Sequence, residues 1–243
     1  MDSNVLTTFL LPQADDPHVG SLDIDVALNF SKIPDDTYQT ILRTLLRRGY
    51  TQDKEQPFRF FRNVKIEGSE PINVEINLMA GEYGGTGKTH RTQKVQDVRA
   101  RKARGCDLAF DGSVNVTLEG ELPNGGKDRV RFRVAGIVPF LVMKGMAMYE
   151  RMKEKDAYDI FYCVEHYPKG VKGLAKEFKP YIRNKLVVEG LEKIRSKFAS
   201  IEYIGPKWVA DFLEVADKED RDVIIRRAYE KISELLDLLH IRT

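Results

Sequence analysis

The stretch Val19-Gly20-Ser21-Leu22-Asp23-Ile24-Asp25-Val26-Ala27-Leu28 decides how the first part of the chain folds. Apolar and polar residues alternate through it, which is typical of a β-strand with one buried face. Residues two apart on a strand share a face, so Asp23 and Asp25 are expected side by side just after a Gly-Ser turn. Mg²⁺ is commonly held by one or two carboxylates together with substrate phosphates. The pattern therefore predicts a metal–nucleotide site at Asp23 and Asp25, with a solvated strand face as the alternative.

Two motifs in this chain resemble a known family. The Gly-Ser-x-Asp-x-Asp pattern of residues 20–25 is similar to the signature of the nucleotidyltransferase-β superfamily, and Leu-Leu-Pro at 10–12 followed by residues 17–28 resembles its AbiEii/AbiGii-type branch. A second stretch, residues 144–160, is similar to the helical motif of that family, in which a Lys is followed by an Arg and a Lys-Asp-x-Tyr-Asp run. The resemblance covers about residues 5–165 and keeps the family order of the two motifs.

The resemblance implies an α+β fold, with an N-terminal mixed-sheet nucleotidyltransferase-like domain (residues 1–137) followed by a C-terminal helical bundle (residues 138–243). Hydrophobic periodicity independently predicts the same order, since strand patterns end near residue 137 and helical patterns follow. The expected strands are 19–30, 58–66, 72–79 and a hairpin of 114–122 with 128–137. A first helix is expected to begin at Pro34 and end at Gly49. Further helices are expected at 138–149, 155–166, a stretch near 171–199, 207–216 and 219–239.

The strand predicted at 72–79 supplies further candidates. Asn73, Glu75 and Asn77 would share one face of it. The resemblance implies an Asp where Asn77 stands, completing the metal site or activating the acceptor. Asn77 can ligate Mg²⁺ through its carbonyl but cannot act as a general base, whereas Glu75 on the same face can replace the missing carboxylate. An exposed strand carboxylate is the alternative for Glu75.

A glycine-rich loop and a basic segment follow. Residues 81–89 nearly match a P-loop, but Glu82 stands where the first Gly belongs, so a loop that lines the site is the better interpretation. At helical spacing Arg91, Lys94 and Arg101 would form a patch for a triphosphate or an RNA backbone, with a solvated helix face as the alternative. The basic residues of this segment are Lys88, Arg91, Lys94, Arg99, Arg101, Lys102 and Arg104.

The helical motif holds four candidate residues. Lys144 and Arg151 are seven residues apart and share a helix face, and Asp156 and Asp159 are helical neighbours. The resemblance implies that Lys144 binds phosphate, and that Asp156 or Asp159 orients Lys144, the base or the acceptor. The alternative is an ordinary ion pair of Asp156 with Arg151 or Lys153, and a helix cap from Asp159.

By resemblance, the chain transfers a nucleoside monophosphate from a nucleoside triphosphate to an acceptor hydroxyl, with Mg²⁺ as cofactor. RNA is the implied acceptor, the 3′ end of tRNA being one candidate, in a toxin–antitoxin or phage-defence setting with a cognate antitoxin as partner. The proposed catalytic residues are Asp23, Asp25, Glu75, Lys144 and Asp156, and the proposed substrate-binding residues are Gly20, Ser21, Asn77, Lys88, Arg91, Arg151 and Asp159.

Family members normally carry a helix and a Gly-Gly pair ahead of the Asp-x-Asp strand, and no such pair precedes Asp23 here. A truncated chain, a start assigned too late and a degenerate member are the open explanations. Two other functional classes stay open beside the enzyme. One is a non-catalytic nucleotide- or RNA-binding module, and the other is a toxin–antitoxin scaffold that binds a partner through its helical half.

Composition adds only broad limits. The chain has 243 residues, a formal net charge of +2 and two cysteines, Cys106 and Cys163, without metal or disulfide spacing. No apolar run approaches the roughly 20 residues of a membrane-spanning helix. We therefore expect a cytoplasmic protein without a membrane partner.

Overall fold

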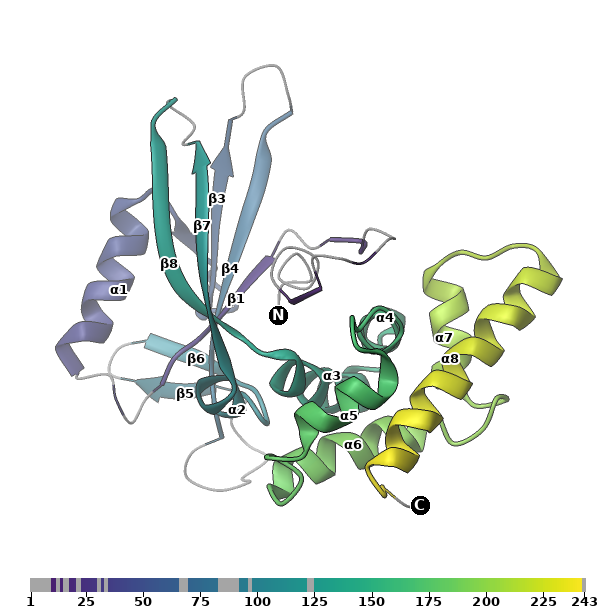
Figure 1. The fold of residues 1–243 in the computed structure, drawn as a ribbon. Coiled ribbons are helices and arrows are strands. Elements are labelled where there is room, and N and C mark those ends of the chain that lie inside the picture. The colour runs from purple at the N-terminus through teal and green to yellow at the C-terminus, as the bar shows by residue number, and fades with distance from the viewer. Residues whose placement is uncertain are drawn as a thin grey trace. The chain divides into compact units, whose positions relative to one another are not determined.

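The computed structural model describes residues 10–11, 14, 18–20, 23–29, 32, 35–65, 70–82, 92–95, 98–121 and 125–241. The chain forms two units: the described residues from Gly20 to Ala135 make the first, and those up to Val19 and from Gly136 onward make the second. The α+β class predicted from the sequence is confirmed (Figure 1). The division lies two residues before the boundary expected at residue 137, and the segment that contains His18 belongs with the helices.

The first unit is built on a mixed sheet with the strand order β2-β3-β4-β6-β5. Strand β4 (Ile72–Ala80) is its centre: β3 (Arg59–Val64) runs antiparallel to it, while β1 (Asp23–Ala27) and β6 (Val98–Lys102) run parallel to it. The short strand β2 (Thr51–Gln52) extends the sheet beside β3, and β5 (Thr92–Val95) pairs antiparallel with β6.

One face of this sheet carries the core of the first unit. Strands β1, β3 and β4 alternate apolar and polar residues, and their apolar side chains pack against helix α1 (Asp35–Arg47). Gly49, two residues after the end of α1, has a positive φ of 81°. Since α1 covers the apolar face, the polar face of the same strands is left for other contacts. The core cluster consists of Leu28, Phe60, Ile76 and Leu78, with Val26, Ile41, Leu42, Leu45 and Tyr50 packed against it.

The basic segment does not fold as predicted. Residues 92–95 and 98–102 form the antiparallel strands β5 and β6, so the helical grouping of Arg91, Lys94 and Arg101 is wrong. Val95 and Val98 are level with each other in this pair, and valine favours strands. Pairing of β6 with Met79 and Ala80 of β4 adds it to the larger sheet. In this pairing Lys94 is opposite Arg99 and Thr92 is opposite Arg101.

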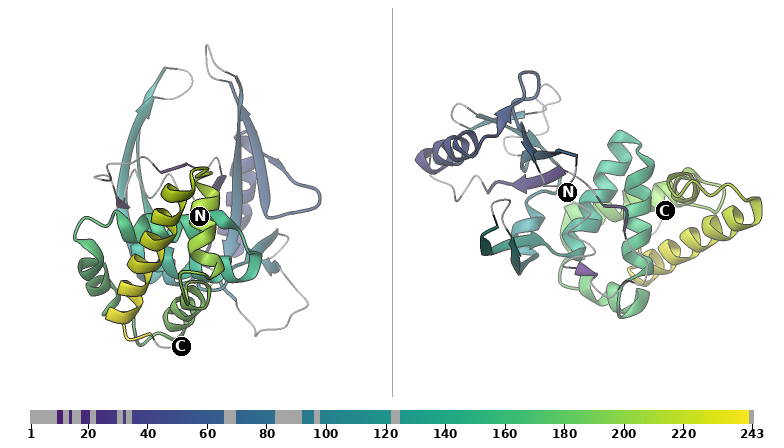
Figure 2. Two further views of the ribbon diagram at one scale, coloured as in Figure 1. Left: turned by 90° about the vertical axis from the view of Figure 1, so that its right-hand side faces the viewer. Right: turned by 90° about the horizontal axis from the view of Figure 1, so that it is seen from above.

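A separate hairpin completes the first unit. Strands β7 (Ser113–Glu121) and β8 (Lys127–Ala135) pair antiparallel along their whole length, after the short helix α2 (Leu108–Asp111). The sequence predicted this hairpin from its alternation and its Pro-Asn-Gly-Gly turn. Figure 2 shows that its far end diverges from the far end of the β3–β4 pair.

The second unit is helical, as the sequence predicted. Its helices α3 and α6 approach closely: a Cβ added at Gly145 would lie 2.5 Å from the carbonyl oxygen of Gly190. Both positions therefore require glycine, because any side chain would force the helices apart. The helices are α3 (Ile137–Arg151), α4 (Glu154–Glu165), α5 (Gly170–Phe178), α6 (Lys185–Lys197), α7 (Ile204–Phe212) and α8 (Lys218–Leu238). Among the described residues, none of these helices is long and apolar enough to cross a membrane.

Candidate functional site

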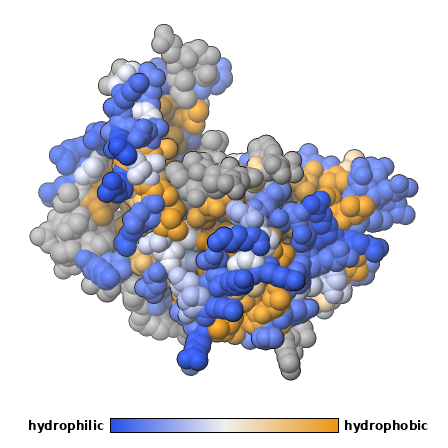
Figure 3. All heavy atoms as spheres, in the orientation of Figure 1, coloured by the Kyte–Doolittle hydropathy of each residue, from blue (hydrophilic) through white to orange (hydrophobic). Residues whose placement is uncertain are grey.

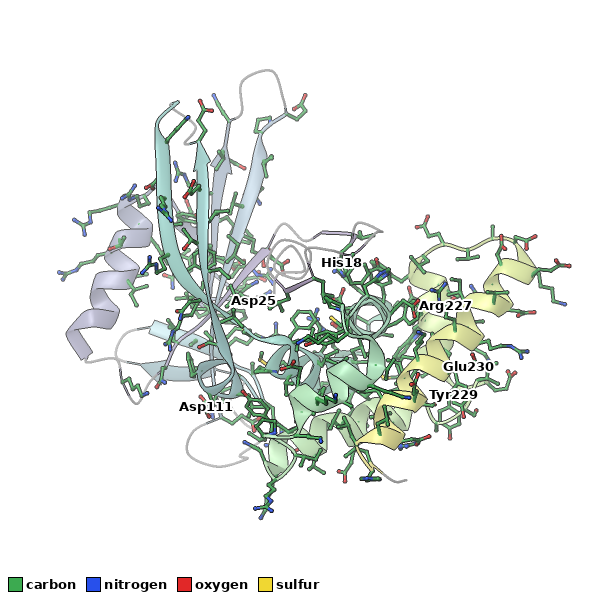
Figure 4. The ribbon with its side chains drawn as sticks, viewed as in Figure 1. His18, Asp25, Asp111, Arg227, Tyr229 and Glu230 are labelled. Atoms are coloured by element: carbon green, nitrogen blue, oxygen red, sulfur yellow. The ribbon has the colours of Figure 1, made fainter. Side chains whose placement is uncertain are left out.

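The polar face of the mixed sheet brings together four predicted site residues. In the parallel pairing of β1 with β4, Asp23 is level with Glu75 and Asp25 is level with Asn77. Residues level with each other in a sheet project from the same face, so all four side chains share it. Asp25 projects from β1 in Figure 4. We call Asp23, Asp25, Glu75 and Asn77 the acidic face; it is opposite the apolar face that α1 covers.

Hydrogen bonds on β4 orient this set. Asn77 Nδ2 donates to Glu75 Oε1 at 3.0 Å, and Arg59 of β3, which is level with Asn77, places Nε 3.1 Å from the same carboxylate oxygen. Asn77 is only 6% exposed, and its Oδ1 atom is buried without a hydrogen-bond partner among the described residues. A buried carbonyl oxygen without a partner is costly, so this atom marks a place where a ligand would be favourable.

The acidic face suits a hard divalent cation. Asp23 and Asp25 supply two carboxylates on one face, and the unpartnered Asn77 Oδ1 supplies a neutral oxygen. Mg²⁺ prefers such oxygens and keeps its other positions for water and substrate phosphates. In the described part of the chain, no three His, Cys, Asp or Glu side chains are grouped as a ready-made metal site. The fit therefore depends on the amide oxygen as well as on the carboxylates.

The remaining predicted residues near this face are only partly described. Gly20 is exposed and lies three residues before the first residue of β1. Ser21, Lys88 and Arg91 lie outside the described residues, and so does most of the glycine-rich loop.

The start of that loop carries acidic side chains. Glu82 forms an ion pair with Arg104 at 2.6 Å, and a Cβ added at Gly81 would lie 1.9 Å from Oδ2 of Asp107. Two carboxylates beside the backbone are unfavourable for a phosphate, which agrees with the sequence-based argument against a P-loop.

The second unit holds the residues of the helical motif in one buried cluster. Lys144 Nζ lies 3.3 Å from Asp156 Oδ1 and 2.5 Å from Asp159 Oδ2, and both aspartates are completely buried. Arg151 Nε donates to Asp156 Oδ2 at 2.6 Å, and Lys155 Nζ donates to Asp159 Oδ1 at 3.2 Å. We call Lys144, Arg151, Lys155, Asp156, Asp159 and His18 the ion cluster.

A tight connection between α3 and α4 assembles this cluster. Met152 adopts a left-handed conformation, with φ 53° and ψ 43°, and only Lys153 separates it from α4. The last turn of α3 therefore lies against the first turn of α4, where Asp156 is located. The alternative of an ordinary ion pair between Asp156 and Arg151 is confirmed, and Asp156 also lies within ion-pair distance of Lys144. Asp159 lies in the middle of α4, so the alternative of a helix cap is wrong.

Asp159 is held ionised by its neighbours. Burial alone would raise the pKa of its carboxyl, but the hydrogen bond from His18 and the charges of Lys144 and Lys155 outweigh burial and hold that pKa well below its usual range. His18 Nε2 lies 2.9 Å from Asp159 Oδ1. Since an ionised carboxylate only accepts, His18 Nε2 donates this hydrogen bond, and the buried Nδ1 of His18 has no partner among the described residues.

Two contributors were missed by reasoning from the sequence. The ring of His18, which is labelled in Figure 4, packs against Tyr158 and Tyr162 of α4, with centroid distances of 5.1 and 4.6 Å. It lies five residues before Asp23, but nothing in the sequence pairs it with a residue 141 positions later. Arg59 was treated only as part of a strand, and its contact with Glu75 depends on the β3–β4 register.

The structure thus groups the predicted residues into two sets, one in each unit. In the comparisons with known proteins, no family model, no curated protein and no solved structure matches this chain.

Proposed function

We propose that this chain is a Mg²⁺-dependent nucleotidyltransferase with a nucleotidyltransferase-like first unit, and that the acidic face is its reaction centre. The observation that carries the proposal is the β1–β4 register, which sets Asp23 and Asp25 level with Glu75 and Asn77. The unpartnered Asn77 Oδ1 supports it further, because a metal-bound nucleotide would satisfy a buried oxygen that otherwise has no partner.

In the proposed reaction, an acceptor hydroxyl oxygen attacks the α-phosphorus of a nucleoside triphosphate. A new P–O bond forms, the bond from the α-phosphorus to the bridging oxygen breaks, and pyrophosphate leaves. Glu75 is the candidate base that takes the hydroxyl proton, since Asn77 cannot accept one in that role. The contacts of Glu75 with Arg59 and Asn77 keep its carboxylate in a defined orientation.

Asp23, Asp25 and Asn77 Oδ1 are the residues that would hold the metal. When bound, Mg²⁺ supplies charge stabilisation for the attacking and leaving oxygens. Asp23 and Asp25 would hold the ion, and the hydrogen bond from Asn77 Nδ2 to Glu75 Oε1 keeps the Asn77 amide and the Glu75 carboxylate in a fixed orientation.

The ion cluster has a separate role in this proposal. Lys144 is 5% exposed and already lies within ion-pair distance of two buried carboxyl groups, so little of its charge is available to a triphosphate. We therefore propose that Lys144, Arg151, Asp156 and Asp159 hold α3 and α4 in position. Phosphate binding by Lys144 stays a prediction from the family motif.

RNA is the proposed acceptor and a cognate antitoxin the proposed protein partner, both carried over from the family resemblance. The second candidate function is a non-catalytic nucleotide-binding module. Asn77 favours it specifically, because the family motif places a carboxylate at that position.

A transfer assay tests the proposal. The chain is incubated with Mg²⁺, each α-labelled nucleoside triphosphate in turn and total bacterial RNA. We expect label to enter RNA, and Asp25→Asn to lower the rate by about 100-fold or more. Asp111→Asn is the matched control, since it makes the same change at an exposed position of α2 (Figure 4).

The two candidate functions give different results. Absence of label with every nucleotide, combined with Mg²⁺-dependent retention of a labelled nucleotide that Asp25→Asn abolishes, would support the binding module. Equal loss of transfer in Asp25→Asn and Asp111→Asn would contradict the assignment of the acidic face.

A further inference from the structure

The hairpin of β7 and β8 separates its charged and apolar residues onto two faces. On one face, four cations of β8 are level with small polar or acidic residues of β7: Arg133 with Asn115, Arg131 with Thr117, Arg129 with Glu119 and Lys127 with Glu121. On the other face Val114, Val116 and Leu118 are level with Val134, Phe132 and Val130. We call the first of these the basic face of the hairpin.

The cations of the basic face are available to a ligand. Lys127, Arg129, Arg131 and Arg133 are all exposed. Arg129 is paired with Glu119 at 3.0 Å, and both side chains of that pair are more than 65% exposed. Among the described residues, Arg131 and Arg133 have no carboxylate within ion-pair distance. Exposed pairs contribute little, so even Arg129 can exchange its partner for a phosphate at low cost.

The arrangement of these residues fits a phosphate backbone. Alternate residues on a strand are about 6.6–6.8 Å apart, so the three arginines form a row of evenly spaced charges along β8. Arginine presents a planar fork that binds phosphate through two hydrogen bonds. Asn115 and Thr117, level with Arg133 and Arg131, add the uncharged donors that commonly contact phosphate and sugar oxygens.

Two other anionic partners fit less well. A lipid surface would have to meet the arginines and the exposed Val114, Leu118 and Val130 together, but these project from opposite faces. The arginine forks could also bind carboxylates, but an acidic protein surface does not present its charges at a regular spacing that matches this row. Figure 3 shows hydrophilic residues, with hydrophobic residues beside them, in the region where Figure 1 draws this hairpin.

We propose that the basic face of the β7–β8 hairpin binds the sugar–phosphate backbone of an RNA strand. No aromatic side chain lies on this face, so base stacking is missing and binding is independent of sequence. The inference deepens the proposed function by giving the RNA acceptor its own contact surface, and it rests on that function only for the choice of RNA as the ligand.

Fluorescence anisotropy with a labelled single-stranded RNA of about 15 nucleotides tests this surface, since such strands occupy sites of roughly that length. The full-length chain is titrated without nucleotide and with EDTA, so that no transfer can occur. We expect the double variant Arg131→Gln/Arg133→Gln to bind about tenfold more weakly at 0.1 M salt, and the slope of log affinity against log salt to fall by about 1.4.

The matched control is Lys218→Gln/Arg226→Gln on α8, which removes the same two charges at exposed positions of the helical unit. We expect it to bind RNA within twofold of the unchanged chain. Equal weakening in both double variants would show that binding follows net charge and would overturn the proposal. Displacement of the RNA by polyglutamate at the same concentration of charge would overturn it as well.

The outcome is independent of catalysis. Asp25→Asn, which we expect to stop transfer, is expected to bind RNA normally in this assay. A chain that binds RNA through the hairpin but transfers no nucleotide would refute only the proposed function. A chain that transfers nucleotide while the hairpin variant binds RNA unchanged would refute only the hairpin proposal.

Discussion

Two pairs of aspartates in this chain, Asp23 with Asp25 and Asp156 with Asp159, differ in their exposure to solvent and in their partners. Asp23 and Asp25 lie two apart on a strand and are partly exposed, next to an amide oxygen that has no partner among the described residues. Asp156 and Asp159 lie three apart on a helix and are completely buried against Lys144, with Arg151 and Lys155 beside them. The second pair already has its cations, whereas the first pair is the one for which we propose a metal ion.

This contrast separates binding from structural support. A partly exposed pair of carboxylates gains from a metal ion, because the ion removes their mutual repulsion. A buried and paired carboxylate cannot lose its partner without leaving a charge in a medium that solvates it poorly. Substitutions in the ion cluster should therefore affect stability, and substitutions in the acidic face should affect ligands.

The largest effect on stability is expected from Asp159→Asn. The amide keeps the shape of the side chain but removes the charge that faces Lys144, Lys155 and His18. Loss of one partner from a buried pair costs about 3–5 kcal/mol. Urea unfolding followed by the fluorescence of Trp208, the single tryptophan, reports on the helical unit directly, since Trp208 lies in α7.

Asp25→Asn is the matched control in the first unit, and we expect it to shift the same unfolding transition by less than about 1 kcal/mol. Similar costs for the two substitutions would remove the contrast between the two pairs.

Acid should weaken the helical unit through the same residue. The pKa of Asp159 in the folded chain lies below its usual range, so Asp159 contributes stability above the unfolded pKa of about 3.9 and loses it as the pH falls through the folded value. Unfolding monitored through Trp208 should become easier as the pH is lowered from about 4. The Asp159→Asn chain should lack this part of the acid dependence; an unchanged acid profile would contradict the prediction.

Much of the fold could be predicted because each element has a clear period. The alternation around Asp23, the hairpin around residue 124 and the helical periodicity after Pro139 each identify one element. The prediction for the basic segment was wrong because the segment is short, and the spacing of Arg91, Lys94 and Arg101 fits one face of a helix as well as two brief strands. Its pairing with the end of β4 decides the outcome, and no local pattern contains that pairing.

The sequence predicts which site residues are neighbours within one strand or helix, but not which strands or helices bring their residues together. The period of a strand places Asp23 beside Asp25 and Glu75 beside Asn77, whereas the β1–β4 register that joins the two pairs is a tertiary contact. The same limit explains His18, whose partner Asp159 lies in a helix that only folding brings close. The ion cluster was partly predictable, because α3 and α4 are adjacent in the sequence.

Magnesium should stabilise the first unit. If the acidic face binds the ion, Mg²⁺ at about 100 times its dissociation constant adds about 2.7 kcal/mol to the free energy of unfolding. For a chain of this size that corresponds to a rise in Tm of several degrees, roughly 2–4 °C per kcal/mol. Scanning calorimetry with Mg²⁺ against EDTA measures it; we expect Asp25→Asn to lose the shift and Asp111→Asn to keep it. A shift that persists in Asp25→Asn would place the ion elsewhere.

The smallest effect on stability is expected from Glu75→Gln, which makes at the acidic face the same carboxylate-to-amide change as Asp159→Asn makes in the ion cluster. Glu75 and Arg59 are 26% and 29% exposed, and the Gln carbonyl can still accept from Asn77 Nδ2, so the cost should stay below about 1 kcal/mol. Transfer should nevertheless fall by about 10²–10⁴-fold if Glu75 is the base.

Calorimetry and the transfer assay on the same preparation of Glu75→Gln separate the two outcomes. A large loss of stability would mean that the contacts of Glu75 contribute as much to the free energy of unfolding as those of Asp159. Unchanged stability with unchanged transfer would remove Glu75 from the mechanism. Unchanged stability with lost transfer is the result that distinguishes a carboxylate used for chemistry from one used to hold two helices together.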